Sequence, residues 1–224
     1  MIQGKNISYE VKYGKDAPEP PKTARGANFK CICCDTPTTL GYIKSETLTD
    51  RMGAVLVAIV AEGNNGRLYI SPNEEHTKAA QVKKPSEYPT GELADAPRNI
   101  WCINYGLDTF DKLFTNRQLT ALTIFSDLVQ EAQKQIEHDG GSKEYAQAVG
   151  VYLAFAVDKL ADLGNALNRW EPNAECPRQL FARQAIPIVW DFAEGNVFSN
   201  SSGSWSVLLD NLKRSFNLLC LQTE

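Results

Sequence analysis

Two long amphipathic stretches, separated by a pair of glycines, constrain the fold of this 224-residue chain most strongly. In the first stretch Thr115 and Gln118 have the spacing of a helix capping box, and apolar residues then recur every three or four positions as far as His138. The apolar residues are Leu119, Leu122, Phe125, Val129, Ala132 and Ile136 in the first stretch, and Tyr145, Val149, Tyr152, Leu153, Ala156, Leu160, Leu163 and Leu167 in the second. The glycines, Gly140 and Gly141, leave only a short connection, so the sequence predicts two helices packed antiparallel, the second running from about Ser142 to Asn168.

The part of the chain that precedes these helices has the pattern of short strands. Residues 7–13 alternate in the strand manner, and residues 54–60 and 67–70 flank a turn rich in Gly and Asn, which predicts a β-hairpin. A short helix is expected to follow, with Ser71 as its N-cap and its end near Val82.

The remaining segments complete the expected organisation. Three prolines within residues 85–97 predict a connector, a third helix is expected near Cys176-Pro177 with a kink or break at Pro187, and a last helix is expected over residues 205–219. We therefore expect an α+β fold, with a small antiparallel β unit followed by a predominantly helical bundle. The expected domains are a β-rich subdomain with a Cys-x-x-Cys knuckle over residues 1–95 and a helical bundle over residues 96–224.

Composition and missing motifs exclude several classes of protein. A net charge of −4 argues against a protein that binds nucleic acid through overall basicity, although it permits a local basic patch. The longest apolar run, Ala54 to Ala61, is far shorter than the roughly 18 residues of a membrane span, and the first residues contain no apolar signal region, so we expect a cytoplasmic protein without a membrane partner. Glycine loops of the nucleotide-binding type are absent, and neither His76 nor His138 has an evident nucleophile partner.

Two Arg-Gln pairs in otherwise apolar surroundings are the main candidates for function. Arg117-Gln118 and Arg183-Gln184 offer donors suited to phosphates or base edges, and Phe114, Phe181 and Trp190 would supply surfaces for stacking. The alternative is that each Arg is held by a carboxylate, because charges in an apolar environment need partners. The carboxylates available are Asp127, Asp191 and Glu194. The residues alone favour this second interpretation, with Asp191 and Glu194 as structural ion-pair partners rather than a catalytic pair.

Cys31 and Cys34 form a Cys-x-x-Cys pair that has the shape of a zinc knuckle. A structural zinc site needs four ligands, and the remaining candidates, Cys33, His76 and Cys102, lie at no standard spacing. Buried thiols at the start of a strand are the simpler interpretation, and both stay open at this point.

Six segments of the chain, in order, resemble the central region of a family of long adenine-specific DNA methylases described as containing a zinc ribbon. The segments are residues 43–54, 58–63, 66–72, 105–107, 113–123 and 181–194. The resemblance implies an S-adenosylmethionine-dependent enzyme whose cofactor loop, of the type Asp-Pro-Phe-x-Gly-Gly-Gly, precedes this region and whose catalytic Asp-Pro-Pro-Tyr motif follows it. Neither motif occurs in this sequence.

The resemblance therefore implies that this chain is a non-catalytic segment of such a methylase, serving target recognition or structure. On its own it is expected to be inactive and to bind no S-adenosylmethionine. The expected partners are DNA and the flanking catalytic domain, and the expected DNA-binding residues are Arg117, Gln118, Arg183, Gln184 and Trp190. The alternative is a protein-interaction or scaffolding module that does not bind nucleic acid.

Overall fold

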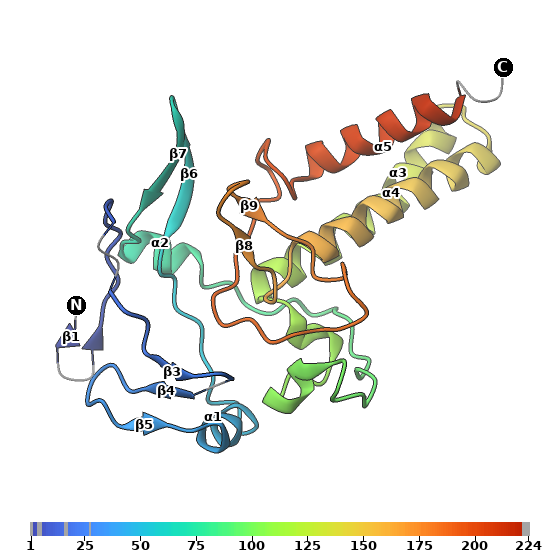
Figure 1. Cartoon of the computed structure of the whole chain (residues 1–224). Coiled ribbons are helices and arrows are strands. Elements are labelled where there is room, and N and C mark those ends of the chain that lie inside the picture. Colours follow the sequence, from blue (N-terminus) through green and yellow to red (C-terminus); the bar gives the residue numbers. More distant parts are fainter. Residues whose placement is uncertain (1, 4–5, 16–17, 27, 221–224) are drawn as a thin grey trace. The chain divides into compact units, whose positions relative to one another are not determined.

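The computed structural model of the chain describes residues 2–3, 6–15, 18–26 and 28–220 (Figure 1). It has an α+β fold, with small antiparallel sheets followed by a helical bundle, as expected from the sequence. The chain divides into two compact units. Unit 1 comprises residues 1–81 and 104–106, and unit 2 comprises residues 82–103 and 107–224. The boundary expected near residue 95 thus lies inside unit 2.

Unit 1 consists of short antiparallel strands and two short helices. Its elements are β1 (Ile2–Gln3), β2 (Asn6–Ile7), β3 (Lys22–Ala24), β4 (Asn28–Lys30), β5 (Pro37–Thr38), α1 (Leu40–Thr47), β6 (Ile59–Gly63), β7 (Gly66–Ile70) and α2 (Glu74–Ala79). Strand β1 pairs with β2, β4 lies between β3 and β5, and β6 pairs with β7.

The predicted hairpin is present as β6 and β7, although its first strand begins five residues later than expected. The predicted strand over residues 7–13 is wrong beyond Ile7. Instead, Val11 N–H donates to Ser71 Oγ at 2.8 Å, and the Tyr13 hydroxyl donates to Tyr69 O at 3.0 Å. The N-cap predicted at Ser71 is also wrong, because Asn73 caps α2 and forms a capping box with His76.

Residues 104–106 return to unit 1 after the chain has entered unit 2. Gly106 has φ +80°, and a Cβ placed on it would lie 2.9 Å from Thr47 O at the end of α1. The ammonium group of Lys44, also on α1, lies 5.7 Å from the centre of the Tyr105 ring. A residue with a side chain would be strained at position 106, so this close approach depends on glycine.

Unit 2 is built on the helical hairpin that the sequence predicts. Helix α3 (Asn116–His138) has the Thr115–Gln118 capping box, and α4 (Lys143–Leu163) begins after Ser142, whose hydroxyl accepts from Tyr145 N–H. Helix α4 ends at Leu163, five residues before the expected end, and Gly164 is its C-cap. Helix α5 (Trp205–Cys220) packs on α4, as Figure 1 shows.

The third helix predicted near Cys176-Pro177 is absent. The chain there forms a two-stranded ladder, β8 (Trp170–Glu171) with β9 (Cys176–Pro177), followed by an irregular segment up to α5. The short 3₁₀ helix η2 (Phe110–Leu113) lies in unit 2, whereas η1 (Trp101–Tyr105) begins in unit 2 and ends in residues that belong to unit 1.

Two groups of buried side chains form the core of unit 2. Cys102, Leu113, Leu167 and Leu180 make up the first group, which joins the two 3₁₀ helices to the segments that follow α4. Phe125, Leu160, Leu163 and Leu208 make up the second, between α3, α4 and α5. Trp205 stacks on Phe125 with the ring centres 4.4 Å apart, which anchors the start of α5. Among the described residues, no helix combines the length and the apolar character that a bilayer span requires.

Candidate nucleic-acid interface

The segment over residues 181–194, which carries the second Arg-Gln pair, is an extended loop and not a helix. Its start is fixed by Asp162, whose carboxylate accepts from Phe181 N–H at 2.9 Å. Ile186 pairs with residues 99–101 in a parallel bridge, donating to Asn99 O and accepting from Trp101 N–H, both at 2.8 Å. Near its end, Ala193 N–H donates to Asn168 O at 3.1 Å. These bonds hold the loop against the body of unit 2.

Arg117 is held in a bidentate ion pair by Glu194. The Nε–H donates to Oε1 at 2.7 Å and Nη2 donates to Oε2 at 2.8 Å, while the Thr115 hydroxyl donates to the same carboxylate at 3.2 Å. The hydrogen bonds from Arg117 to Glu194 raise the pKa of the guanidinium group, and partial burial opposes them. The pair joins the first turn of α3 to the end of the loop, which is the structural role that the sequence suggested for Glu194.

The Gln118 side chain faces the interior of the protein and not solvent. It is 6% exposed, and its Oε1 accepts from Thr115 N–H at 2.8 Å to complete the capping box. Its Nε2 is buried without a hydrogen-bond partner among the described residues. Arg117 and Gln118 therefore have roles in the fold, and their assignment as DNA-binding candidates stays a prediction.

Arg183 and Gln184 have the opposite placement. Both are exposed, and neither makes a hydrogen bond or ion pair within the described part of the chain. Asp191 is likewise exposed and forms no ion pair with a described residue, so the expected pairing of Arg183 with a carboxylate is wrong. The two Arg-Gln pairs therefore have different surroundings.

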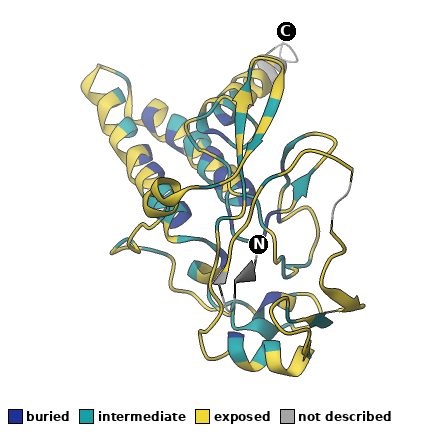
Figure 2. Cartoon of the chain, turned by 90° about the vertical axis from the view of Figure 1, so that its left-hand side faces the viewer, coloured by how far each residue is buried: buried dark blue, intermediate teal, exposed yellow. Residues whose placement is uncertain are grey.

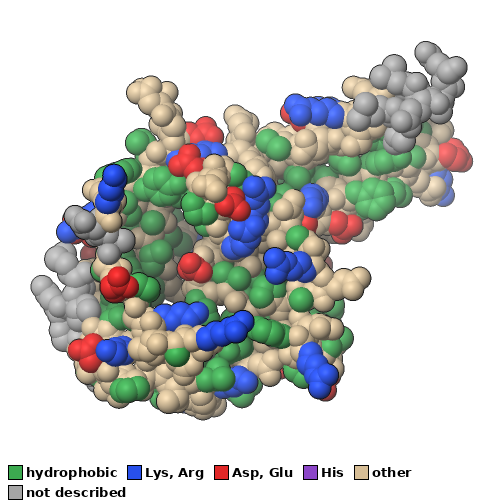
Figure 3. All heavy atoms as spheres, in the orientation of Figure 1, with side chains coloured by type: hydrophobic (Ala, Val, Ile, Leu, Met, Phe, Trp, Pro, Cys, Tyr) green, Lys and Arg blue, Asp and Glu red, His purple; other side chains and the backbone are tan. Residues whose placement is uncertain are grey.

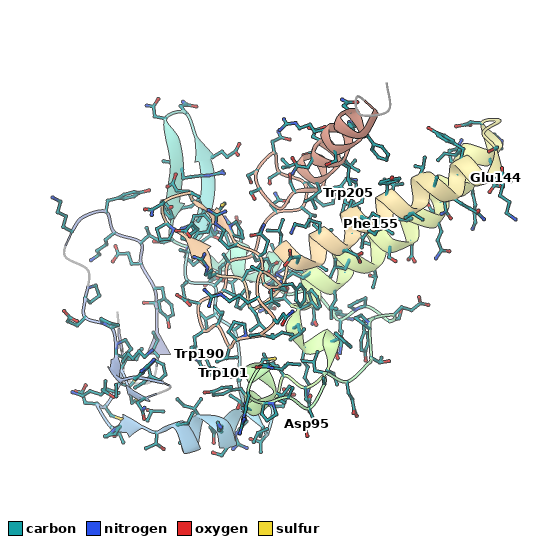
Figure 4. The ribbon with its side chains drawn as sticks, turned by 45° about the vertical axis from the view of Figure 1, so that its right-hand side comes forward. Asp95, Trp101, Glu144, Phe155, Trp190 and Trp205 are labelled. Carbon is teal, nitrogen blue, oxygen red and sulfur yellow. The ribbon has the colours of Figure 1, made fainter. Side chains whose placement is uncertain are left out.

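Exposed aromatic side chains lie in the loop that carries Arg183 and in the segment that pairs with this loop. Trp190 is 45% exposed, and Trp101 is 56% exposed on the segment that pairs with Ile186. Figure 4 shows Trp101 and Trp190 in the same region, away from Phe155 on α4. Arg98, on the same segment as Trp101, is exposed and has no ion-pair partner among the described residues.

Sequence reasoning missed Trp101 and Arg98. The parallel bridge between Ile100 and Ile186 brings the segment of Arg98 and Trp101 to the loop. The two bridged residues are 86 positions apart in the chain, so no local sequence pattern predicts their pairing. We call Arg98, Trp101, Arg183, Gln184 and Trp190 the arginine–tryptophan surface. The carboxylates of Asp95 and Asp191 are exposed in the same two segments and reduce its net charge.

The Cys-x-x-Cys pair lies in the turn between β4 and β5. Cys31 is half-buried and Cys34 is exposed, which contradicts the interpretation as buried thiols. Two of the other candidate zinc ligands have roles in the fold. His76 Nδ1 accepts from Asn73 N–H in the cap of α2, and Cys102 is fully buried in the core of unit 2. In the part of the chain that the structure describes, no group of three or more His, Cys, Asp and Glu side chains is arranged to hold a metal ion.

Comparison of the chain with protein-family models, with curated proteins and with solved structures found no match.

Proposed function

We propose that this chain is a non-catalytic, target-recognition or structural segment of an S-adenosylmethionine-dependent DNA adenine methylase that acts in the cytoplasm. The resemblance of six ordered segments to that family supports the proposal, and the absence of the cofactor loop and the Asp-Pro-Pro-Tyr motif agrees with a non-catalytic role. The flanking catalytic domain would then supply both the bound cofactor and the chemistry on the target base, which such enzymes take out of the duplex.

The observation that carries the DNA-binding part of the proposal is the exposure of Arg183 and Gln184 without partners in the described structure. An arginine placed in this way is suited to a phosphate, and a Gln amide is suited to a base edge. Exposed indole rings such as those of Trp101 and Trp190 are surfaces on which an unpaired base stacks. Because Asp95 and Asp191 are also exposed there, we expect modest affinity that falls steeply with added salt.

The test compares Arg183→Ala with two other variants in a fluorescence-anisotropy titration of duplex DNA between 50 and 200 mM salt. Over this range each phosphate contact contributes roughly 0.9 to the slope of log affinity against log salt concentration. Arg183→Ala is expected to weaken binding and to lower the salt slope by about 1 without changing stability. Arg214→Ala, which removes an exposed arginine from α5, is the matched control and should bind as the original chain does.

Arg117→Ala separates the two Arg-Gln pairs. Loss of the ion pair with Glu194 should lower the free energy of unfolding by about 1 kcal/mol while DNA binding by the folded fraction is retained. Equal affinity of the original chain and Arg183→Ala at every salt concentration would contradict the DNA-binding proposal. Incubation of the chain alone with labelled S-adenosylmethionine and DNA should transfer no methyl group.

A protein-interaction module is the second candidate, and a separate observation favours it. Ile124 and Leu128 on α3, and Val151 and Phe155 on α4, are large apolar side chains with about half of their surface exposed. Each pair is four residues apart, so each lies on one face of its helix. Figure 3 shows hydrophobic side chains exposed along the helices. If these faces associate, light scattering will show self-association that Ile124→Glu or Val151→Glu abolishes, while Gln130→Glu leaves it unchanged.

A further inference from the structure

Three cysteines gather in one solvent-accessible turn of unit 1. Cys31 follows β4, and Cys33 and Cys34 lie in the turn that leads to β5. Asp35 N–H donates to Cys31 O at 2.8 Å, and Cys31 N–H donates to Thr36 O at 2.9 Å. The left-handed conformation of Asp35, with φ +57°, closes the turn. These bonds fold residues 31–36 back on themselves and bring the backbone at Cys31 close to the backbone at Cys34.

The three thiols lie within four consecutive residues of the turn. Cys34 Sγ lies 3.1 Å from the Thr36 hydroxyl. Cys33 and Cys34 are exposed, so a small molecule can reach their sulfur atoms. Disulfide formation requires Cα atoms about 4.4–6.8 Å apart, and two cysteines three residues apart in a turn closed by backbone hydrogen bonds meet this need with little movement of the backbone.

The three thiols differ in their readiness to act as nucleophiles. Hydrogen bonds from the Thr36 hydroxyl, then from the Thr36 backbone and the Cys31 thiol, lower the pKa of Cys34, against opposition from partial desolvation and the charge of Asp35. Partial desolvation, followed by the nearby Cys31 thiol, raises the pKa of Cys33. Because the thiolate is the reactive form, the turn favours attack by Cys34 over attack by Cys33.

We propose that the Cys31-x-x-Cys34 turn is a reversible thiol–disulfide exchange site that reacts with low-molecular-weight disulfides such as glutathione disulfide. Cys34 Sγ is the attacking atom, Cys31 is the resolving thiol, and Cys33 is not required. The site is independent of the proposed role in DNA recognition.

The reaction balances in two exchanges. The Cys34 thiolate attacks one sulfur of glutathione disulfide, which forms a mixed disulfide on Cys34 and releases one glutathione thiolate. The Cys31 thiolate then attacks Cys34 Sγ, which forms the Cys31–Cys34 disulfide and releases the second glutathione. Two protein thiols are oxidised, one glutathione disulfide is reduced to two glutathione molecules, and the two thiol protons pass to the two leaving thiolates. Excess reduced glutathione reverses both steps.

The test follows thiol labelling of the full chain. The reduced protein is incubated at pH 7 with defined ratios of glutathione disulfide to glutathione, quenched with a maleimide and digested with trypsin. Cleavage after Lys30 and Lys44 yields one peptide, residues 31–44, that contains all three cysteines. As the ratio rises, this peptide is expected to lose two of its three maleimide labels and to regain them when excess glutathione is added. Cys176, which is half-buried elsewhere, serves as an internal reference.

Variants assign the roles of the three thiols. Cys34→Ser should slow the initial reaction about tenfold, since ordinary thiols are mostly protonated at pH 7. Cys31→Ser should stop the reaction at a stable glutathione adduct on Cys34. Cys33→Ser is the matched control and should form the disulfide at the original rate. Thr36→Val should slow the reaction at pH 7, with the difference vanishing at a pH at which all the thiols are ionised.

Three outcomes would overturn the proposal. One is a peptide 31–44 that keeps all its labels at ratios that oxidise Cys176. The second is a Cys33→Ser variant that reacts as slowly as Cys34→Ser. The third is a purified protein whose turn resists glutathione disulfide until a chelator removes a bound metal ion, which would make the turn a metal site instead.

Discussion

Cys102 differs from the thiols of the turn because none of its surface is exposed. It packs against Leu113, Leu167 and Leu180 in unit 2 and lies one residue from Trp101. Burial raises the pKa of this thiol from 9.0 to about 11, because the charged form loses its hydration. A thiol in this environment is a small apolar group of the core, and it should resist alkylation in the folded protein.

This pKa shift predicts a loss of stability in alkaline solution. Between about pH 9 and pH 11 the unfolded chain releases the Cys102 proton while the folded chain keeps it, so the free energy of unfolding falls as pH rises. Two pKa units correspond to at most about 2–3 kcal/mol. Urea denaturation of the original chain and of Cys102→Ala at pH 8 and pH 11 checks this. The stability difference between the two proteins should shrink at pH 11, and a difference independent of pH would contradict the assignment.

At the scale of elements, the contact of α3 with α4 depends on Gly150. This buried glycine lies inside α4, and a Cβ placed on it would be 1.8 Å from Gln133 Nε2 on α3. The Gln133 side chain occupies the space that a larger residue would need. Glycine lowers the stability of a helix interior by about 1 kcal/mol relative to alanine, so the close packing of the two helices opposes the local helix preference.

A pair of variants measures this opposition. Gly150→Ala in a Gln133→Ala background should raise the free energy of unfolding by about 1 kcal/mol relative to Gln133→Ala alone, because the helix gains propensity and the clash is removed. Gly150→Leu should lower it by about 1–3 kcal/mol, because the helices are forced apart. Chemical denaturation gives both values. An equal gain from Gly150→Ala with and without Gln133 would show that the two residues are not coupled.

The elements that the sequence predicts correctly are those whose signals are local. The Thr115–Gln118 capping box, the apolar periodicity of α3 and the Gly-Gly connection all lie within a few residues of the structure they specify. The segment over residues 181–194 has comparable apolar content, but its backbone groups pair with Asn99, Trp101 and Asn168, which are distant in the chain. Pro187 also lacks the N–H that a helix would use. Tertiary pairing therefore overrides the local pattern.

The candidate site divides in the same way. Glu194 as the partner of Arg117 was among the pairings that the residues suggest, because a guanidinium in apolar surroundings needs a carboxylate. Gln118 faces inward, whereas Gln184 faces solvent. This difference depends on the backbone path of the loop and cannot be predicted from two identical Arg-Gln pairs. Trp101 joins the arginine–tryptophan surface only through the bridge between Ile100 and Ile186.

At the scale of the whole molecule, the two units differ in how much they bury. Among the described residues of unit 1, only Thr47 is buried, whereas unit 2 contains both groups of buried apolar side chains. Strands β3 to β7 accordingly appear in yellow and teal in Figure 2, and the dark blue residues concentrate in unit 2. Since burial of apolar surface is the main favourable term in folding, unit 1 has little of its own to resist opening.

Hydrogen exchange followed by mass spectrometry tests this difference. Backbone amides of β6 and β7 should exchange with solvent at least about tenfold faster than amides in the middle of α3 and α4, because local opening of unit 1 exposes little apolar surface. The matched comparison within unit 2 is the exposed loop over residues 196–203, which should exchange as fast as unit 1. Uniform protection across both units would contradict the prediction.

The return of residues 104–106 to unit 1 determines how this protein can be divided or recombined. The chain passes between the units at residues 81–82, 103–104 and 106–107, so unit 1 is not a continuous cassette. A fragment that ends at Gln81 would lack Gly106 beside Thr47 and Tyr105 beside Lys44, and a fragment that begins at Val82 would carry three residues that belong to the other unit. Each unit consists of two separate segments of the chain. Exchange of one unit between related genes would therefore require both of its segments to be exchanged together.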